Sequence, residues 1–378
     1  MTISRRTWSW AALAALAIAL VLDVWYHPMH IGGGFSIDFH TYLAAARVGL
    51  QSGWTHLYDQ ALVGVEQTRL VPTLWSQPFL SPPGVAWIVV PLTAFPYWVA
   101  FWLWAAFTFL AFAGALGWAG LSIGLTRWIA VLAALSPWWV VHAVSVGQVV
   151  PLVAAAVVVA WRLLRERKDI AAGVVLSLVF LKPNTAILAP IALLMAGRFR
   201  AFAGWAAAAG VIFLIAVATL GSDGLTSYVE QLMAPLPSGA HSLTLKGALG
   251  ATGTVALILR VLVVATVFVT AFKLRASPGL VLAAGVVGTL IVAPYLHGSD
   301  LCLLSAAAWI VWEERTAFAW RLPLVAGWIF ASPYLLLVGL GPNLNRMPWL
   351  EYVLLAALAV VSWKHLTASD DLRTRAPA

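Results

Sequence analysis

The chain has 378 residues, of which 62% are hydrophobic and only 10% are charged, and its mean hydropathy is +0.92. Soluble domains carry roughly 25% charged residues, so this composition excludes a water-soluble protein and predicts one that lies in a lipid bilayer. The net charge of +8 does not indicate a nucleic-acid partner, because the basic residues fall in short gaps between apolar runs, as in the positive-inside pattern of membrane proteins.

These basic clusters predict the orientation of the chain. They are Arg5 and Arg6; Arg162, Arg165, Arg167 and Lys168; Arg198 and Arg200; Lys273 and Arg275; Arg315 and Arg321; and Lys364, Arg373 and Arg375. If they are cytoplasmic, both termini are cytoplasmic and the longest hydrophilic loop, residues 27–83, lies on the far side of the membrane. We expect a bacterial inner-membrane protein whose functional site faces the periplasmic or extracellular side.

The apolar runs predict an all-α, polytopic membrane protein. An uncleaved first span is expected at 8–25, and further spans follow at 170–181, 184–197, 201–220, 250–272, 278–294, 300–312, 322–340 and 349–363. Between the far-side loop and the cytoplasmic cluster that begins at Arg162, the chain must cross the membrane an odd number of times. This stretch, however, holds four apolar segments, 84–95, 98–120, 127–145 and 148–163. Residues 84–95 are short and flanked by prolines, so we expect them to be re-entrant, which leaves about twelve crossings. Residues 1–364 then form one membrane domain and 365–378 a polar cytoplasmic tail.

The long loop is predicted to contain a helix. Three glycines, 32–34, precede Asp38, which is a good N-cap, and residues 39–50 are good helix formers. One apolar face of this segment favours a helix that lies along the membrane surface. The position of Asp38 fits two roles equally well. It could cap the helix, or it could act as a general base in a water-filled cavity.

Several short motifs occur in order along the chain. They are Asp38-Phe39-x-x-Tyr42 with Ala44-Ala45, Leu57-Tyr58-Asp59, Pro78-Phe79-Leu80-Ser81-Pro82-Pro83, Pro91-Leu92, Gly147-Gln148, Ala172-Gly173 leading to Leu181-Lys182-Pro183, and Pro294-Tyr295-Leu296-His297-Gly298-Ser299-Asp300. On this order and topology, the chain resembles the polyprenyl-phosphate-mannose-dependent α-mannosyltransferases of glycosyltransferase family 87, in the GT-C superfamily. Ser81 departs from the family pattern, which more often has an aromatic residue there, and this puts the shape of the acceptor side in question.

The resemblance implies a GT-C fold, a polyprenyl-phosphate-linked sugar donor and a glycolipid or glycan acceptor on the non-cytoplasmic face. It assigns the role of general base to Asp38 and groups Tyr42 and Gln148 with the substrate-binding residues. An inverting transfer needs a carboxylate that accepts the proton of the attacking hydroxyl. The leaving lipid phosphate needs cations or hydrogen-bond donors near the membrane surface.

Further candidates are polar residues outside the cytoplasmic clusters. Lys182 interrupts an apolar run and Arg260 lies within another, where a charge is expensive and suggests function, although both could extend to the interface. The resemblance raises His297 to the second-ranked site residue. Asp300 could be an acid but is more simply a helix cap, and His40, two residues after Asp38, could touch substrate or only water. The other cations outside the cytoplasmic clusters are Arg47, Arg69, Arg346 and Lys246. We expect Arg47, Arg69 and Arg346 to be simply exposed to solvent.

We expect no resident cofactor, since the donor is a substrate. Asp38 and His40 are too few to predict a metal site, although some relatives in the superfamily use one. Two other functions compete with the enzyme, a transporter or flippase of a lipid-linked intermediate and a non-catalytic scaffold. A transporter predicts internal repeats and paired charges near mid-membrane, whereas this chain gathers its polar candidates on one face.

Overall fold

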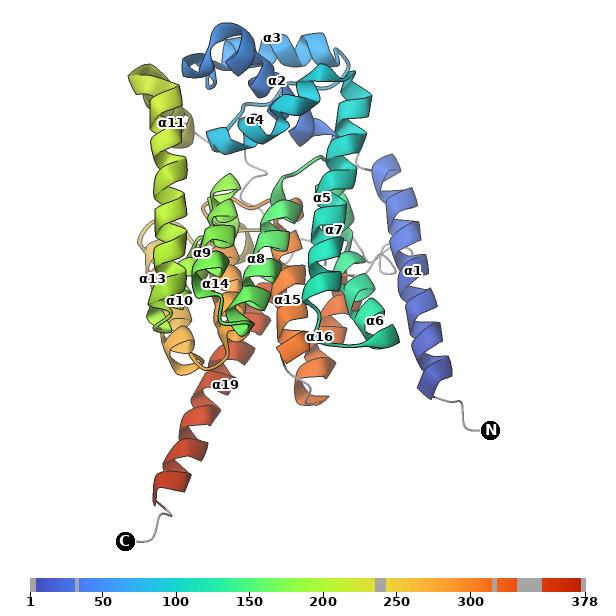
Figure 1. The fold of residues 1–378 in the computed structure, drawn as a ribbon, viewed down its shortest axis with the longest axis vertical. Coiled ribbons are helices and arrows are strands. Elements are labelled where there is room, and N and C mark those ends of the chain that lie inside the picture. Colours follow the sequence, from blue (N-terminus) through green and yellow to red (C-terminus); the bar gives the residue numbers. More distant parts are fainter. Residues whose placement is uncertain (1–4, 31–33, 235–242, 315–317, 332–348, 375–378) are drawn as a thin grey trace.

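The computed structural model describes residues 5–30, 34–234, 243–314, 318–331 and 349–374. In these ranges all regular elements are α-helices or short 3-10 helices, and no strand occurs. The all-α prediction is therefore confirmed. The helices form an upright bundle with a group of crosswise helices over one end (Figure 1).

The bundle contains most of the predicted apolar segments. Its helices are α1 (Arg5–His30), α5 (Tyr97–Ala119), α6 (Gly124–Leu135), α7 (Trp138–Ser145), α8 (Val150–Arg165), α9 (Asp169–Leu176), α10 (Leu188–Met195), α11 (Phe199–Met233), α13 (Gly253–Lys273), α14 (Pro278–Val292), α15 (Cys302–Glu314), α16 (Phe318–Ala331) and α19 (Trp349–Thr374). The chain-terminal ends of α1 and α19 lie at the end of the bundle opposite the crosswise helices (Figure 1). Helix α19 continues through most of the segment that we expected to be a polar tail.

The crosswise helices, called here the cap, are formed by the predicted long loop and by the residues that directly follow it. They are α2 (Ile37–Ser52), η2 (Trp54–His56), α3 (Gln60–Leu70), α4 (Pro83–Val89) and η3 (Val90–Ala94). Helix α2 is not the one-sided surface helix that we expected. Its residues are mostly buried, because α3, α4, η2 and η3 all pack against it.

Three helices, α5, α11 and α13, are long and apolar enough to cross a membrane, and α6 with α7 gives a fourth if this pair, bent by 63°, is one broken span. The twelve expected crossings are not shown, since the shorter apolar helices have apolar lengths of 10–17 residues, at or below the lower limit of the roughly 17–25 residues that a straight span needs. Helices α4 and η3, of seven and five residues, are too short to cross, which agrees with the expectation for residues 84–95.

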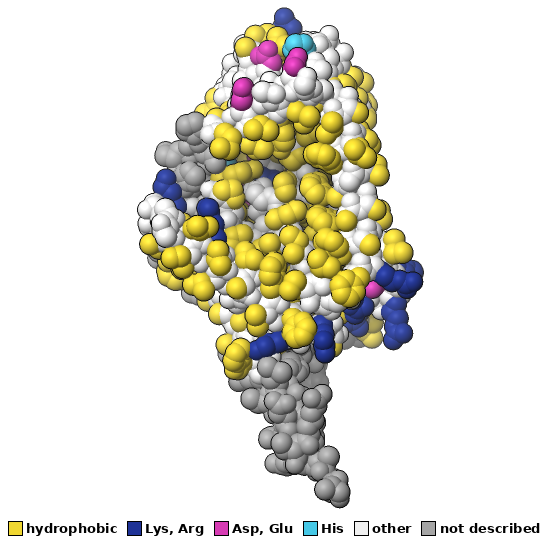
Figure 2. Space-filling view, turned by 90° about the vertical axis from the view of Figure 1, so that its left-hand side faces the viewer, with side chains coloured by type: hydrophobic (Ala, Val, Ile, Leu, Met, Phe, Trp, Pro, Cys, Tyr) yellow, Lys and Arg dark blue, Asp and Glu magenta, His cyan; other side chains and the backbone are white. Residues whose placement is uncertain are grey.

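The surface of the bundle is apolar. Trp102 on α5, Phe213 on α11 and Val261 on α13 are each about three-fifths exposed, whereas the residues of α14 are buried almost throughout. Figure 2 shows a band of hydrophobic side chains between the cap, with its acidic residues, and an end rich in lysine and arginine. An apolar band of this extent would not be stable in water, so the chain is an integral membrane protein.

Three short 3-10 helices interrupt the bundle on the side that faces the cap. They are η4 (Ser177–Leu181) and η5 (Pro183–Thr185), between α9 and α10, and η7 (Gly298–Leu301), between α14 and α15. Helix α12 (Leu245–Leu249) precedes α13. The breaks carry two of the predicted polar motifs, and together with the first turn of α2 they provide the residues of the candidate site.

Candidate active site

The first turn of α2 is anchored to the loop between α7 and α8. The Ser36 amide donates to the Ser145 carbonyl at 2.8 Å, and the Asp38 amide donates to the Val146 carbonyl at 2.9 Å. The next residue, Gly147, has a φ of +76°, and a Cβ there would lie 2.4 Å from the Phe39 Cβ. Only glycine allows this approach, so Gly147 brings the α7–α8 loop directly against Asp38.

The Asp38 carboxylate accepts hydrogen bonds from two side-chain amides. Gln77 Nε2 donates to its Oδ1 and Gln148 Nε2 donates to its Oδ2, both at 2.9 Å. The N-cap position belongs to Ser36, which has a φ of 59°. The interpretation of Asp38 as a helix cap is therefore wrong, because its carboxylate points to residues from other elements.

The two glutamines are themselves held in place. Tyr42 donates its hydroxyl proton to Gln148 Oε1 at 2.9 Å, and Gln67 forms two hydrogen bonds, of 2.8 and 3.0 Å, with the backbone of Gln77. Burial, together with the negative charge of Asp38, raises the pKa of Tyr42 well above its usual value, so this phenol stays protonated and keeps donating. The network fixes the direction of the Asp38 carboxylate, which remains partly exposed.

A buried ion pair lies near this carboxylate, in the breaks of the bundle. Lys182 Nζ, between η4 and η5, is 2.7 Å from Asp300 Oδ1 in η7. Burial alone would lower the pKa of the lysine, but Asp300, Tyr295 and Asp38 together raise it above its usual value. Lys182 is therefore charged at neutral pH, and Asp38 and Tyr42 are close enough to interact electrostatically with this pair.

The motif that contains His297 provides the rest of this side. The His297 amide donates to Asp300 Oδ2 at 2.9 Å. Asp300 therefore takes part in a capping box inside η7, with His297 as the N-cap, instead of capping the helix that follows it, and it also binds Lys182. The His297 side chain is exposed, and its ring centroid is 6.2 Å from that of Tyr295. Burial raises the pKa of Tyr295, whose hydroxyl is thus neutral and able to donate.

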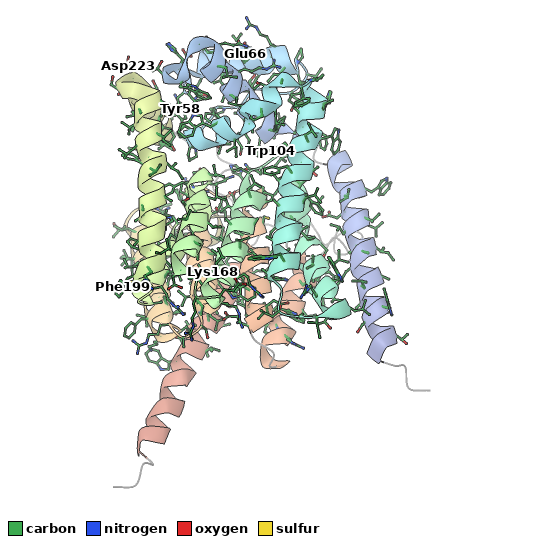
Figure 3. The ribbon with its side chains drawn as sticks, in the orientation of Figure 1. Tyr58, Glu66, Trp104, Lys168, Phe199 and Asp223 are labelled. Atoms are coloured by element: carbon green, nitrogen blue, oxygen red, sulfur yellow. The ribbon has the colours of Figure 1, made fainter. Side chains whose placement is uncertain are left out.

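Two predicted site residues make their contacts elsewhere. His40 is fully buried, with Nε2 2.7 Å from the Gln67 carbonyl and its ring against Tyr97. Burial lowers its pKa, so the neutral imidazole joins α2 to α3. Arg260 is on α13, and its buried Nε has no hydrogen-bond partner among the described residues. Arg69 is paired with Glu66 on the cap (Figure 3), and Arg346 lies outside the described residues.

An aromatic wall joins the cap to the outer part of α11. Tyr58 stacks on Tyr228 at 4.4 Å and on Phe79 at 5.5 Å between ring centroids, and its hydroxyl donates to the Ser81 carbonyl. Figure 3 shows Tyr58 at the underside of the cap beside α11. Helix α11 turns at Gly221 (φ 62°), and this turn lets the segment with Tyr228 pack on the cap.

Sequence reasoning missed Gln77 and Tyr228. Gln77 directly precedes the Pro78-to-Pro83 motif, so its position beside a motif was the available signal. Tyr228 had no such signal, because only the turn of α11 brings it to the cap. In the described ranges no three His, Cys, Asp or Glu side chains gather in a way that could hold a metal ion.

The fold and this polar site under a helical cap define the class, an integral membrane protein with a site at one end of its bundle. Residues 79–338 match the model of glycosyltransferase family 87. The match covers more than half of the chain, so the chain belongs to this family and is a membrane glycosyltransferase. No curated protein and no solved structure matches it significantly. The matched range holds Gln148, Lys182, Arg260 and His297, whereas Asp38, His40 and Tyr42 precede it.

Proposed function

We propose that the enzyme transfers a hexose, mannose by the family resemblance, from a polyprenyl-phosphate donor to a hydroxyl of a lipid-linked or cell-envelope glycan. Three features support this proposal: membership of the family, the position of the polar site under the cap, and the concentration of basic residues at the opposite end. By the positive-inside pattern, the cap then lies on the non-cytoplasmic side.

One observation carries the proposal, the Asp38 carboxylate held by two amides. A general base must be ionised, correctly oriented and open to the attacking hydroxyl. Gln77 and Gln148 orient the two oxygens, and each oxygen keeps a lone pair for a further partner. Lys182 places a positive charge near this carboxylate.

The reaction follows from these positions. The acceptor oxygen attacks the anomeric carbon as its proton moves to Asp38, and the bond between that carbon and the phosphate oxygen breaks. The bonding electron pair leaves with the polyprenyl phosphate, and the configuration at the anomeric carbon inverts.

The developing charge on the leaving phosphate needs donors that are already in place. Lys182, which uses part of its donor capacity on Asp300, and the exposed His297 are the groups that we assign to this role. Tyr42 and Gln148 act through Asp38, and His40 acts through the packing of α2 on α3. We also assign Arg260 to the donor phosphate, because its buried Nε has no hydrogen-bond partner among the described residues.

The test is a transfer assay on membranes that contain the chain. Wild type, Asp38→Ala and Asp223→Ala are each incubated with radiolabelled polyprenyl-phosphate mannose and a panel of acceptors. Asp223 is an exposed carboxylate at the outer part of α11 (Figure 3), so it serves as a matched control. We expect transfer by wild type and Asp223→Ala and none by Asp38→Ala.

Undiminished transfer by Asp38→Ala would overturn the assignment of the base. If no acceptor is labelled and the labelled lipid instead crosses the membrane, the chain is a transporter and the proposed reaction is wrong.

A further inference from the structure

A cavity opens at the basic end of the bundle, far from the cap. Its volume is about 780 Å³, and its polar lining consists of Arg165, Arg167, Lys168, Arg198, Arg200 and Asp169. We call it the basic pocket. Figure 3 shows Lys168 and Phe199 at this end, with Tyr58 and the cap at the other. The basic pocket is therefore separate from the candidate active site.

The pocket exists because two helices start side by side. Helices α9 and α11 touch through their backbones, since a Cβ on Gly173 would lie 1.9 Å from the Ala201 carbonyl oxygen and one on Gly204 would lie 2.5 Å from that of Ile170. Helix α14, which begins at Pro278, contributes a third wall. The positive ends of the helix dipoles thus point toward the same space.

The side chains of the pocket carry more positive than negative charge. Arg198 is paired with Asp169 at 3.6 Å, Lys168 with Glu166 at 2.8 Å, and Arg165 with Glu314 at 3.8 Å. In the described part of the chain no carboxylate pairs with Arg167 or Arg200. Two of the five cations are therefore uncompensated, and the cavity attracts an anion.

An apolar stripe begins at the wall of the pocket. Ile170, which lines the cavity, and the next residues on the same face of the helical segment, Val174 and Leu178, are 58%, 47% and 41% exposed. Their spacing of four residues places them in one row toward the hydrophobic band. A ligand that fits both features has an anionic head and an apolar tail.

We propose that the basic pocket binds the headgroup of an anionic phospholipid, with an acyl chain along the stripe of Ile170, Val174 and Leu178. Basic pockets between membrane helices suit lipid phosphates, because the cations neutralise the phosphate at the depth where headgroups lie. The bound lipid joins α9 to α11, and α9 leads directly to Lys182 in the candidate active site. The site is independent of the transfer reaction, so it does not depend on the proposed function.

Native mass spectrometry of the purified full chain tests this. The probes are phosphatidylglycerol, which is anionic, and phosphatidylethanolamine, which has no net charge. We expect the wild type to retain phosphatidylglycerol preferentially. Arg200→Gln should weaken its binding about fivefold and Arg198→Gln with Arg200→Gln about 25-fold, from roughly 1 kcal/mol per cation at a membrane surface.

The matched control is Arg275→Gln, an exposed arginine at the same end that does not line the pocket. It should bind phosphatidylglycerol as the wild type does. Because Arg200 is exposed, its substitution should not affect folding, so the single variant remains informative if the double variant is unstable. Equal binding by Arg200→Gln and Arg275→Gln, or equal retention of the two lipids, would overturn the proposal. Displacement of the lipid by excess inorganic phosphate would identify a site for a free anion instead.

Discussion

Gly147 offers the sharpest test of how the fold positions Asp38. Two separate properties exclude a side chain at this position. Its φ is +76°, and a Cβ there would lie 2.4 Å from the Phe39 Cβ. In Gly147→Ala a residue with a side chain must adopt the left-handed conformation, and it must also move away from Phe39. Both changes occur next to Gln148, which holds the Asp38 carboxylate. The substitution therefore changes the site without removing any of its polar groups.

A control separates the cost of the left-handed backbone from the cost of the overlap, because Gly197 has a φ of +77° but open space where its Cβ would lie. For Gly197→Ala, the left-handed conformation alone costs about 1–2 kcal/mol. For Gly147→Ala, the overlap with Phe39 adds about 1–3 kcal/mol. The first turn of α2 must also move, and a shift of about 1 Å at a reacting group can lower the rate about 100-fold.

The assay combines thermal unfolding of the purified proteins with the rate of sugar transfer at saturating donor. We expect Gly197→Ala to lose a little stability and no activity, and Gly147→Ala to lose more stability and most of its transfer rate. Equal losses of stability and activity in the two variants would refute the argument that Gly147 is needed for the approach of the loop to Asp38.

Three further predictions concern the polar network. Gln148→Leu should lower the transfer rate about 10- to 100-fold through misorientation of Asp38, and unchanged kinetics at saturating donor would contradict this. Lys182→Met leaves Asp300 buried without its partner and should destabilise the protein by about 3–5 kcal/mol. In Lys182→Met with Asp300→Leu, chemical denaturation should show most of this stability restored, apart from the contribution of the hydrogen bond between the His297 amide and Asp300. The transfer assay should show no recovery of activity, and recovery of both properties would exclude Lys182 from the site. Because the folded-state pKa of His40 is lowered from 6.5, the unfolded chain binds the proton more tightly, so the free energy of unfolding should fall as the pH drops below about 6.5. His40→Gln should flatten that part of the stability profile, measured by denaturation across pH, and an unchanged profile would refute the assignment.

The sequence was sufficient to predict the long apolar helices. Residues 98–120 and 250–272 were expected as spans and are found as Tyr97–Ala119 and Gly253–Lys273, because apolar length and basic ends are local properties. The count of twelve crossings is not shown by the structure, for the opposite reason. The short helices around Lys182 are broken by backbone that packs inside the protein, which the hydropathy of a segment does not report.

The candidate site was predictable only in part. Asp38, Tyr42, Gln148 and Lys182 were named from motifs, and the fold brings them together. Gln77 was not named, because it lies beside a motif and not within one, and only the folded chain shows that it contacts Asp38. The capping alternative for Asp38 failed because the N-cap of α2 is Ser36, which has a left-handed backbone and lies two residues before Asp38.

The central claim is that the Asp38 carboxylate removes the proton of the acceptor hydroxyl. Asp38→Asn tests it most directly, because the amide keeps the size of the side chain and cannot take up the proton, although it replaces one of the two oxygens that Gln77 and Gln148 contact by an NH2 group. The measurement is the single-turnover transfer rate of purified enzyme with donor bound, together with donor affinity. We predict a rate about 10²- to 10⁴-fold lower than that of the wild type, with donor affinity unchanged. A transfer rate like that of the wild type would contradict the account.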